Sequence, residues 1–490
     1  MTRAEFVNDL IEQAKKSWSQ YWATLPDEQR LRLSGMEEEL AELTRDLQQR
    51  LWLLLGASLD ALAEELEGRC GCGHRRERRS DTVSVDALGH SVEMPCTYFY
   101  CRRCHQGVSP VRKWLGIESG GVSLGFERAV TDLTTRMAFG DAVESMHEHH
   151  DQEVDRTKAE RITYAVAREA QTYLQARRGA AKEKLHGGET EGVGQLVFTA
   201  DGGAVPVGKM QRPATSDGEK TAVRKLAKGT RAIAGREARF ISVHAADATT
   251  GRVVDCHIAP LERPEFTGDR MFWAALEAGL TERSRIHGVF DMGKWVHTQF
   301  EKAFCAYEHT ACADIMHVAE YLMEAGRVLV GEEKSLGWAM EHKRRMLAGE
   351  YEHVLGDLKA HTCEPGCAKN ESGKCLVRVA EGYLSNHRKY MDQYAEFMIA
   401  NLPVGSGEAE SGIRHVIKRR MAVAGAWDEE HAKLMLALLS IRASGWWDEF
   451  WRWRTERDRA AWRARQSSEA KVLFRNKRRL QRAAPVKVAA

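Results

Sequence analysis

Residues 195–201 read QLVFTAD, an apolar run that is typical of a buried β-strand and that ends on an acidic residue. Around this run the pattern changes from helical periodicity to short strands separated by turns. Further strands are expected at residues 239–246, 252–258, 286–290 and 311–314, and a helix at 269–280. Three strands in hairpin order, followed by alternating strands and helices, predict a mixed α/β sheet with helices packed on it.

Two acidic residues directly follow predicted strands, and turn residues come after both. Asp201 precedes two glycines, and Asp291 precedes a Met-Gly pair. Because sites in open α/β sheets lie at strand ends, both carboxylates are expected in one crevice. Clustered carboxylates suit Mg²⁺ or Mn²⁺, and two such ions about 3.5–4 Å apart can activate a nucleophile and stabilise the leaving oxygen of a phosphodiester. A single aspartate at a strand end could equally form a turn or cap a helix.

A glycine-rich segment further along the chain adds a third acid. Residues 401–411 read NLPVGSGEAES and lead into a helix with the cations Arg414, Lys418, Arg419 and Arg420. Glu410, Arg414 and Lys418 are spaced by four residues, so they are expected on one helical face. A carboxylate beside cations fits a metal ligand next to groups that hold DNA phosphates. A solvated helix with i,i+4 ion pairs would show the same charges.

The run Gly-Ser-Gly-x-x-Glu-Ser at residues 405–411, followed by Arg420 and then Trp427, resembles the C-terminal signature of DDE-type insertion-sequence transposases, in particular the ISKra family. The resemblance covers residues 195–444. It implies an RNase H-like catalytic domain with a helical insertion before the final acid, two bound Mg²⁺ (or Mn²⁺) ions, and cleavage and joining of DNA. The acids that it implies are Asp201, Asp291 and Glu410.

The sequence departs from the family pattern around the second acid. The family has an Asp-Gly pair there, whereas residues 291–295 read DMGKW. Asp314 is therefore a rival second acid, and Glu408 competes with Glu410 for the third position. Residues 314–320 read DIMHVAE and resemble the Asp-x-x-His-Val segment of the family. His317 in this segment is interpreted as an active-site neighbour that hydrogen-bonds an acid or a phosphate.

The chain has eleven cysteines and no apparent export signal, which favours metal ligands over a disulfide framework. Two close pairs flank a stretch with strand-like patterning and predict a zinc ribbon; they are Cys70 with Cys72 and Cys101 with Cys104. Because the first pair is tighter than usual, His74 or Cys96 could replace one ligand. Buried free thiols are the structural alternative.

A second group of soft ligands lies in the helical insertion. Its members, spread over fifteen residues around a Pro-Gly turn, are His361, Cys363, Cys367 and Cys375. Four such ligands could close a small zinc loop. The isolated Cys256, Cys305 and Cys312 are expected to be small core residues.

The remaining segments predict a modular chain. Leucines at helical spacing in residues 36–66 indicate a helix, either packed on the protein or self-associating. Three helical pieces in residues 125–175 suit a helix-turn-helix module or a simple bundle. The expected order is an N-terminal helical region (1–66), a zinc-ribbon-like segment (67–116), a helix-turn-helix-like DNA-binding segment (117–185), an RNase H-like catalytic domain (190–330 and 400–445), a helical insertion (331–399), and a Trp/Arg-rich helix with a basic tail (446–490).

The overall charge hides an asymmetry. The chain has 72 basic and 70 acidic side chains, a net charge of +2, yet residues 466–490 hold seven basic side chains and one acidic. No stretch is long and apolar enough to predict a membrane span. We therefore expect a cytoplasmic, nucleoid-associated DNA transposase of bacterial type, a homo-oligomer that binds double-stranded DNA. The alternatives are an inactive transposase-derived regulator that only binds DNA, and an RNase H-like nuclease without strand transfer.

Overall fold

The computed structural model describes residues 33–464, except residues 67–69, 118–120, 188–192, 211–230, 247–252, 259–260, 365, 423–424 and 462, together with isolated residues before residue 33. The predicted basic tail at 466–490 lies outside the described residues. The chain divides into two compact units. The first comprises residues 1–134, 139–163 and 451–490, and the second comprises residues 135–138 and 164–450.

The first unit contains a long β-hairpin covered by a helix. Strands β1 (Glu77–Ala87) and β2 (His90–Tyr100) pair antiparallel, and the short strands β3 (Gly107–Val108) and β4 (Gly121–Val122) complete a sheet of order β3-β2-β1-β4. Helix α2 (Leu33–Leu66) packs on β2, and a Cβ at Gly56 would lie 3.0 Å from that of Met94. The helix therefore packs on its own unit, as one of the two sequence readings predicts, while Leu40 and Leu53–Leu55 stay exposed.

Shorter helices follow the hairpin in the first unit. They are α3 (Pro110–Leu115), α4 (Leu124–Thr134) and α5 (Phe139–His150), and α6 (Arg156–Gly187) begins there. The three helical pieces expected in this region are therefore present as α4, α5 and α6.

The second unit contains a five-stranded mixed sheet, as the sequence predicts. Its order is β7-β6-β5-β8-β9, and β6 is antiparallel to both of its neighbours while β8 and β9 run parallel to β5. The strands are β5 (Gln195–Met210), β6 (Arg231–Ala246), β7 (Val253–Ile258), β8 (Arg285–Phe290) and β9 (His309–Ala313). Apolar residues on β5 pack against helix α8 (Lys294–Phe304), with Phe198 5.0 Å from Phe304 between ring centroids.

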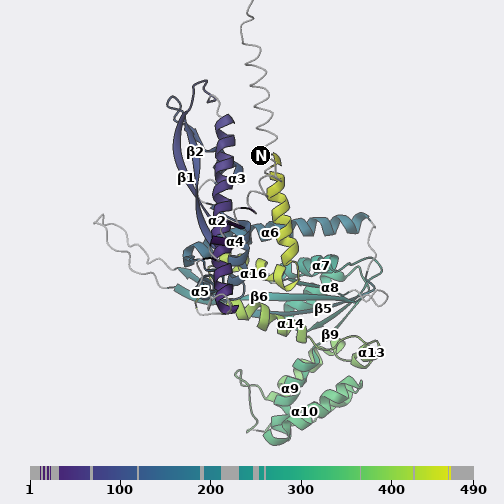
Figure 1. Ribbon diagram of the computed structural model, residues 1–490. Helices are drawn as coiled ribbons and strands as arrows, with labels where there is room; N and C mark the ends of the chain where they lie inside the picture. The colour runs from purple at the N-terminus through teal and green to yellow at the C-terminus, as the bar shows by residue number, and fades with distance from the viewer. Residues whose placement is uncertain are drawn as a thin grey trace, which may run out of the picture. The chain divides into compact units, whose positions relative to one another are not determined.

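The expectation that the first strand ends at Asp201 is wrong. Strand β5 continues to Met210 because β6 pairs with it along its whole length. Asp201 therefore lies inside the strand. The predicted helix at 269–280 is α7 (Thr267–Glu277), which with α8 lies on one side of the sheet in Figure 1.

A helical segment interrupts the unit between β9 and the glycine-rich motif. It consists of α9 (Ile315–Leu329), α10 (Glu332–Leu347), α11 (Tyr351–Lys359), α12 (Leu376–Asn386) and α13 (Tyr394–Ile399). The chain then returns to the sheet through α14 (Gly407–Gly412), a π-helical turn η3 (Ile413–Lys418), α15 (Arg419–Met421) and α16 (Glu429–Ala443). Figure 1 shows α14 on the side of the sheet opposite α7 and α8.

Candidate active site and metal centres

Three aspartates lie at the same level of three neighbouring parallel strands. Ala200 of β5 pairs with Phe290 of β8, and Phe290 pairs with Ala313 of β9. The residues that follow these three are Asp201, Asp291 and Asp314. Because neighbouring strands lie about 4.7–4.9 Å apart, the register brings Asp201 close to Asp291 and Asp291 close to Asp314.

Asp201 lies in an environment that disfavours its charge. Burial raises the pKa of Asp201 above its ordinary value, and the negative charges of Asp291 and Glu410 raise it further. The Gly202 N–H, which donates to Asp201 Oδ1 at 2.6 Å, and the charge of His317 oppose this rise in pKa. Asp201 therefore interacts electrostatically with three of the residues singled out from the sequence, and they come from different elements.

Glu410 reaches this region because α14 packs directly on the sheet. A Cβ at Gly412 would lie 2.1 Å from the ring of Phe240, which pairs with Asp201 across β5 and β6. Only glycine allows so close an approach of helix and sheet. The Glu410 side chain is 68% exposed and accepts a hydrogen bond from Arg414 Nη2 at 3.2 Å. Glu408 is exposed on the same short helix.

The acids do not enclose a single ion in this conformation. Among the described residues, no three carboxylates bring their oxygens within 4.8 Å of one another. A pair of ions needs a wider set of ligands than one ion, because the ions themselves are about 3.5–4 Å apart.

The loop of Asp291 is held in an unusual backbone conformation. Met292 has a φ of 64°, a left-handed value that costs a non-glycine residue about 1–2 kcal/mol. Asp291 Oδ1 accepts a hydrogen bond from Gly293 N at 2.9 Å, and the Asp291 carbonyl accepts one from the Tyr383 hydroxyl at 3.2 Å. Strained backbone of this kind is concentrated at functional sites.

Asp314 has a different environment from Asp291. It is 4% exposed and caps helix α9, accepting a hydrogen bond from Met316 N at 2.7 Å. Its other oxygen accepts hydrogen bonds from the backbone N–H and the hydroxyl of Ser406. Both carboxylate oxygens are thus occupied by protein donors. His317 lies in the first turn of α9, and its Nδ1 is 3.2 Å from Oε2 of Glu320.

The cations after Glu410 separate into exposed and buried groups. Arg414, Lys418 and Arg419 are exposed, but Arg420 is 2% exposed and stacks on Trp427 at 4.7 Å. Burial lowers the pKa of Arg420 to about 10. Arg420 therefore lies in the interior of this structure, and its contact with DNA stays a prediction. The π-helical turn also changes the predicted spacing between Arg414 and Lys418.

Four cysteines of the first unit form a compact cluster. The Sγ atoms of Cys70 and Cys104 are 3.3 Å apart, those of Cys72 and Cys101 are 3.5 Å apart, and all four lie within 4.8 Å of one another. Hydrogen bonding, first of all from the backbone at Cys72, lowers the pKa of Cys70 to about 6. Such a cluster can hold a metal ion such as zinc.

The alternative ligands lie outside this cluster. His74 Nδ1 is 4.0 Å from Cys72 Sγ, and Nε2 of the same ring is 2.9 Å from Nη1 of Arg103. Cys96 is buried in the core of the hairpin, where burial raises its pKa. The metal site therefore needs neither residue.

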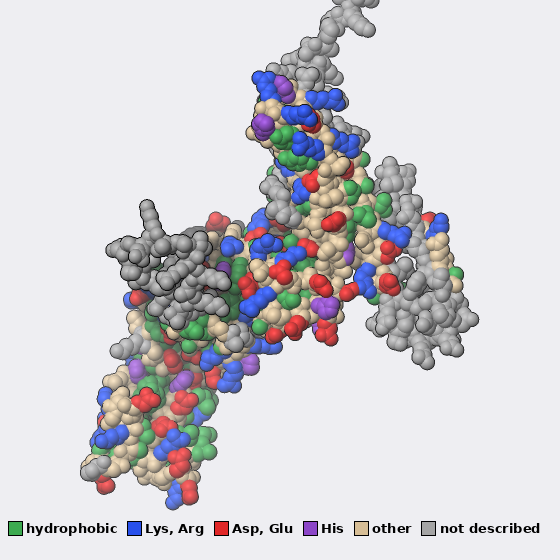
Figure 2. All heavy atoms as spheres, turned by 90° about the vertical axis from the view of Figure 1, so that its left-hand side faces the viewer, with side chains coloured by type: hydrophobic (Ala, Val, Ile, Leu, Met, Phe, Trp, Pro, Cys, Tyr) green, Lys and Arg blue, Asp and Glu red, His purple; other side chains and the backbone are tan. Residues whose placement is uncertain are grey.

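A basic surface surrounds the four cysteines, and the sequence reasoning missed it. We call it the arginine tip; its exposed members are Arg75, Arg78, Arg79, Arg102 and Arg103. Glu77 forms ion pairs with two of them, with Arg79 at 3.8 Å and with Arg102. Figure 2 shows Lys and Arg side chains gathered at this end of the hairpin. The RRERR run at residues 75–79 beside Cys72 was the signal that could have found it.

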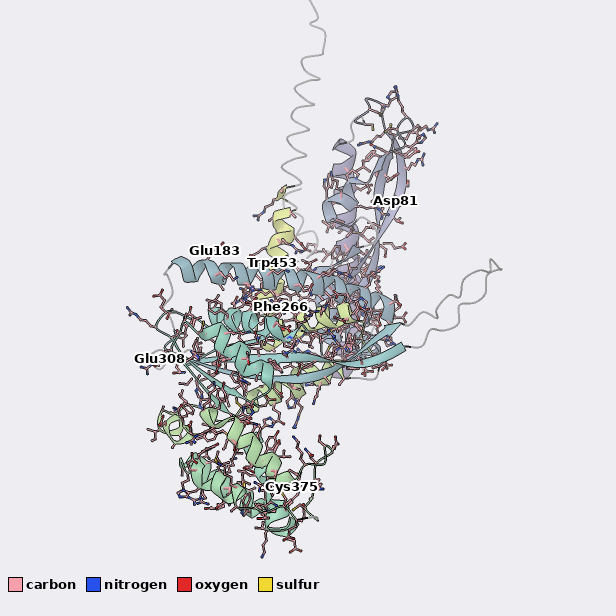
Figure 3. All side chains as sticks on the ribbon, turned by 180° about the vertical axis from the view of Figure 1, so that it is seen from behind. Asp81, Glu183, Phe266, Glu308, Cys375 and Trp453 are labelled. Atoms are coloured by element: carbon pink, nitrogen blue, oxygen red, sulfur yellow. The ribbon has the colours of Figure 1, made fainter. Side chains whose placement is uncertain are left out.

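The second group of cysteines also converges in the structure. The ligand atoms of His361, Cys363 and Cys375 lie within 4.8 Å of one another, and Cys367 Sγ is 3.5 Å from His361 Nε2. Figure 3 shows Cys375 at the end of the helical segment far from the sheet. Of the isolated cysteines, Cys312 is buried as predicted, whereas Cys305 is exposed and that prediction is wrong. The side chain of Cys256 lies outside the described part of the chain.

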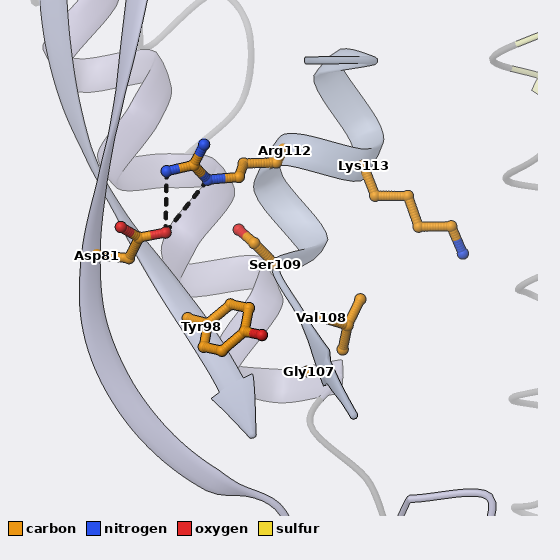
Figure 4. Close-up of a pocket in the computed structure, with 7 residues that line it drawn as sticks. All are labelled: Asp81, Tyr98, Gly107, Val108, Ser109, Arg112 and Lys113. Atoms are coloured by element: carbon orange, nitrogen blue, oxygen red, sulfur yellow. Dashed lines mark hydrogen bonds and ion pairs between the residues drawn. The ribbon is translucent and has the colours of Figure 1, made fainter. Parts of the chain in front are cut away.

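A pocket of about 330 Å³ in the first unit is lined by an ion pair that holds the structure together. Arg112 on α3 donates from Nε (3.2 Å) and Nη2 (3.0 Å) to Asp81 Oδ2 on β1, with Tyr98 and Ser109 nearby (Figure 4). This ion pair fixes α3 on the hairpin.

The tryptophans after residue 445 contribute to packing where they are described, since Trp451 is buried and Arg177 stacks on Trp446 at 4.1 Å.

Comparisons with known proteins add a distant likeness to a solved structure. No protein-family model matches the chain, and no curated protein matches it. Among solved structures, the chain is similar to the Drosophila P element transposase strand transfer complex, with a TM-score of 0.24 and 8% sequence identity over 70% of this chain and 82% of that chain. In the described part of the chain, no helix combines the length and apolar character needed to span a membrane.

Proposed function

We propose that the chain is a DDE-type DNA transposase whose second unit is an RNase H-like catalytic domain. The observation that carries the proposal is the strand register that sets Asp201 beside Asp291, with the helix of Glu410 packed on the same side of the sheet. Among the described strands of this sheet, β6 runs antiparallel to the other four, an arrangement that is typical of RNase H-like domains and supports the proposal. Zinc in the first unit and DNA contact by the arginine tip belong to the same proposal.

Asp201, Asp291 and Glu410 would hold a pair of Mg²⁺ or Mn²⁺ ions. Their hard oxygen donors suit these ions. Burial first of all, and then repulsion from Asp291 and Glu410, raise the pKa of Asp201, and a bound cation relieves such repulsion. When bound, the ions activate the attacking oxygen and stabilise the leaving oxygen of the phosphodiester.

The chain's own residues orient the DNA. Arg414 is hydrogen-bonded to Glu410 and would turn to a phosphate oxygen when Glu410 takes up its metal-binding rotamer. Lys418 and Arg419, both exposed, would contact neighbouring phosphates. Arg420 is not part of this set, because its guanidinium holds Trp427 in the interior.

The first unit would bind the ends of the element. We interpret the four-cysteine cluster as a zinc ribbon that carries the arginine tip on its surface. The clustered positive charge of the tip suits binding to DNA phosphates. The end of α5 is less suitable, since Glu144, Glu148, Glu153 and Asp155 line a pocket there. DNA contact is therefore assigned to the tip rather than to this part of the helix-turn-helix-like segment.

The decisive experiment uses the full chain and labelled DNA that carries the sequences flanking its own coding region. With Mg²⁺ or Mn²⁺ we expect cleavage that leaves a 3′-hydroxyl, followed by joining of that end to a target duplex. Asp201→Asn and Glu410→Gln should abolish both reactions while DNA binding persists.

Three other outcomes would change the proposal. If Glu408→Gln rather than Glu410→Gln abolished the reaction, the third acid would be Glu408. Binding without any cleavage would favour the inactive regulator. Cleavage without joining would favour a nuclease.

A further inference from the structure

We propose that a second structural metal site closes the loop between α11 and α12 and that, through α12, it positions the loop of Asp291. The ligands of this zinc clasp are His361, Cys363, Cys367 and Cys375. The metal site stands independently of the proposed function, whereas its link to Asp291 rests on that function.

The distances between the ligand atoms fit one zinc ion. His361 Nε2 is 3.5 Å from Cys367 Sγ and 3.8 Å from Cys375 Sγ. Around a tetrahedral zinc with Zn–S of about 2.3 Å and Zn–N of about 2.0–2.1 Å, nitrogen and sulfur are about 3.6 Å apart. The ligand atoms of His361, Cys363 and Cys375 lie within 4.8 Å of one another, and Cys367, which is outside this group of three, contacts it through His361. A small movement of the Cys367 side chain would make it the fourth donor that closed structural sites use.

The loop is folded so that its donors face one another, with Cys375 in the hydrophobic core of the second unit and Cys367 packed against that core. The Glu364 N–H donates to Cys367 Sγ at 3.3 Å, a typical contact around a metal-bound thiolate. Asn370 closes a turn by accepting from Ser372 N and Lys374 N, and Arg378 Nη2 donates to the His361 carbonyl at 2.7 Å. Metal binding would supply the cohesion that so short a loop lacks.

Helix α12 connects the clasp to the active site. Cys375 is the N-cap residue of α12, and Tyr383 lies about 12 Å further along the same helix at 1.5 Å per residue. The Tyr383 ring stacks on Tyr321 of α9 with centroids 4.0 Å apart. Its hydroxyl donates to the carbonyl of Asp291, immediately before the left-handed Met292.

Tyr383 is therefore a positioning residue for Asp291. Its phenol hydroxyl carries a proton at neutral pH and is therefore a donor to the Asp291 carbonyl. A shift of α12 would move this donor away from the strained loop. Fixing the start of α12 with a metal ion prevents such a shift.

The clasp is tested by counting zinc in the purified full chain. Cys72→Ser removes a ligand from the first cluster, and we expect that variant to keep about one zinc per chain. Cys72→Ser with Cys363→Ser should keep none, whereas Cys72→Ser with the exposed Cys305→Ser should match Cys72→Ser alone. A Cys72→Ser chain without zinc would overturn the clasp.

A measurement on the unaltered chain covers the case in which a variant does not fold. Cobalt added to the metal-free protein should give tetrahedral d–d and thiolate bands that saturate at two equivalents. Saturation at one equivalent would overturn the clasp. His361→Cys should retain two equivalents, because thiolate replaces imidazole, and His361→Ala should not.

The link to Asp291 is tested with Tyr383→Phe, which removes only the hydroxyl. We expect unchanged zinc content and unchanged KM for DNA, a kcat for cleavage lower by about five- to tenfold, and a higher Mg²⁺ concentration at half-maximal rate. Wild-type kcat and Mg²⁺ dependence in this variant would refute the link. Absence of cleavage by the wild-type chain would instead count against the proposed function, and the zinc count would still decide the clasp.

Discussion

Replacing Asp314 distinguishes a structural carboxylate from a metal ligand. Asp314 accepts hydrogen bonds from Met316 N (2.7 Å), from Ser406 N (3.1 Å) and from the Ser406 hydroxyl. A helix N-cap contributes about 1 kcal/mol, and each hydrogen bond to a buried charged acceptor contributes about 1.5 kcal/mol or more. Asp314→Ala should therefore reduce the free energy of opening around the start of α9 and the Ser406 loop by about 4 kcal/mol.

Asp291→Ala should behave differently. Its side chain is partly exposed and accepts one backbone hydrogen bond, from Gly293, so its loss should cost about 1 kcal/mol. Removing it also relieves the repulsion that raises the pKa of Asp201. A stable but inactive Asp291→Ala variant is the result expected of a metal ligand.

Hydrogen exchange followed by mass spectrometry gives the required local measurement. In Asp314→Ala, amides in peptides covering residues 309–320 and 401–412 should exchange about 10³-fold faster than in the wild type. Ser406→Ala, which removes only the hydroxyl, is the matched control and should give about a tenfold increase. The reasoning fails if Asp314→Ala exchanges like the wild type while losing cleavage, because Asp314 would then be the second metal ligand.

Three further predictions concern other parts of the chain. His287 is fully buried between Thr310 and the Pro403 carbonyl, and burial lowers its pKa from 6.5. Because the unfolded chain then binds the proton more readily than the folded one, the second unit should lose stability as pH falls below about 6.5. Urea unfolding at pH 7.5 and pH 5.5 should show this loss for the wild type and a much smaller loss for His287→Gln. Arg75→Ala should lower the slope of log K for DNA against log salt by about 0.9, measured by fluorescence anisotropy. Arg420→Ala should destabilise the second unit by about 3 kcal/mol in thermal unfolding, whereas Arg414→Ala should leave it within about 0.5 kcal/mol.

The sequence predicted the parts of the site that depend on local patterns. Asp291 follows β8 as expected, because a short apolar run and its turn are local signals, whereas Asp314 was expected inside the last strand and lies just after β9. The two groups of cysteines were also found by spacing alone. The expected mixed sheet is present for the same reason.

Other features depended on contacts between distant residues and could not be predicted. The length of β5 is set by its pairing with β6, so Asp201 proved to lie inside a strand. Arg420 carries the same charge as its neighbours, and only the fold shows that it stacks on Trp427. Tyr383 had no motif at all, since its role comes from one hydrogen bond to a carbonyl far away in the sequence.

The ends of the helical segment explain how a long insertion can precede Glu410 without displacing it. At its start, Asp314 binds the backbone and hydroxyl of Ser406, and the Ile315 N–H donates to the Val404 carbonyl at 2.9 Å. At its end, the Pro403 carbonyl accepts from His287 in the centre of β8 at 2.9 Å. The segment therefore leaves and rejoins the sheet at one point, and its length has little effect on where α14 begins, because the cost of closing a loop grows only slowly with length. Tyr383 is a contact of another kind, since it connects the body of the segment to the Asp291 loop. Through the Tyr383 hydrogen bond the helical segment can influence the position of Asp291, while the contacts at the two ends of the segment keep the helix of Glu410 in place.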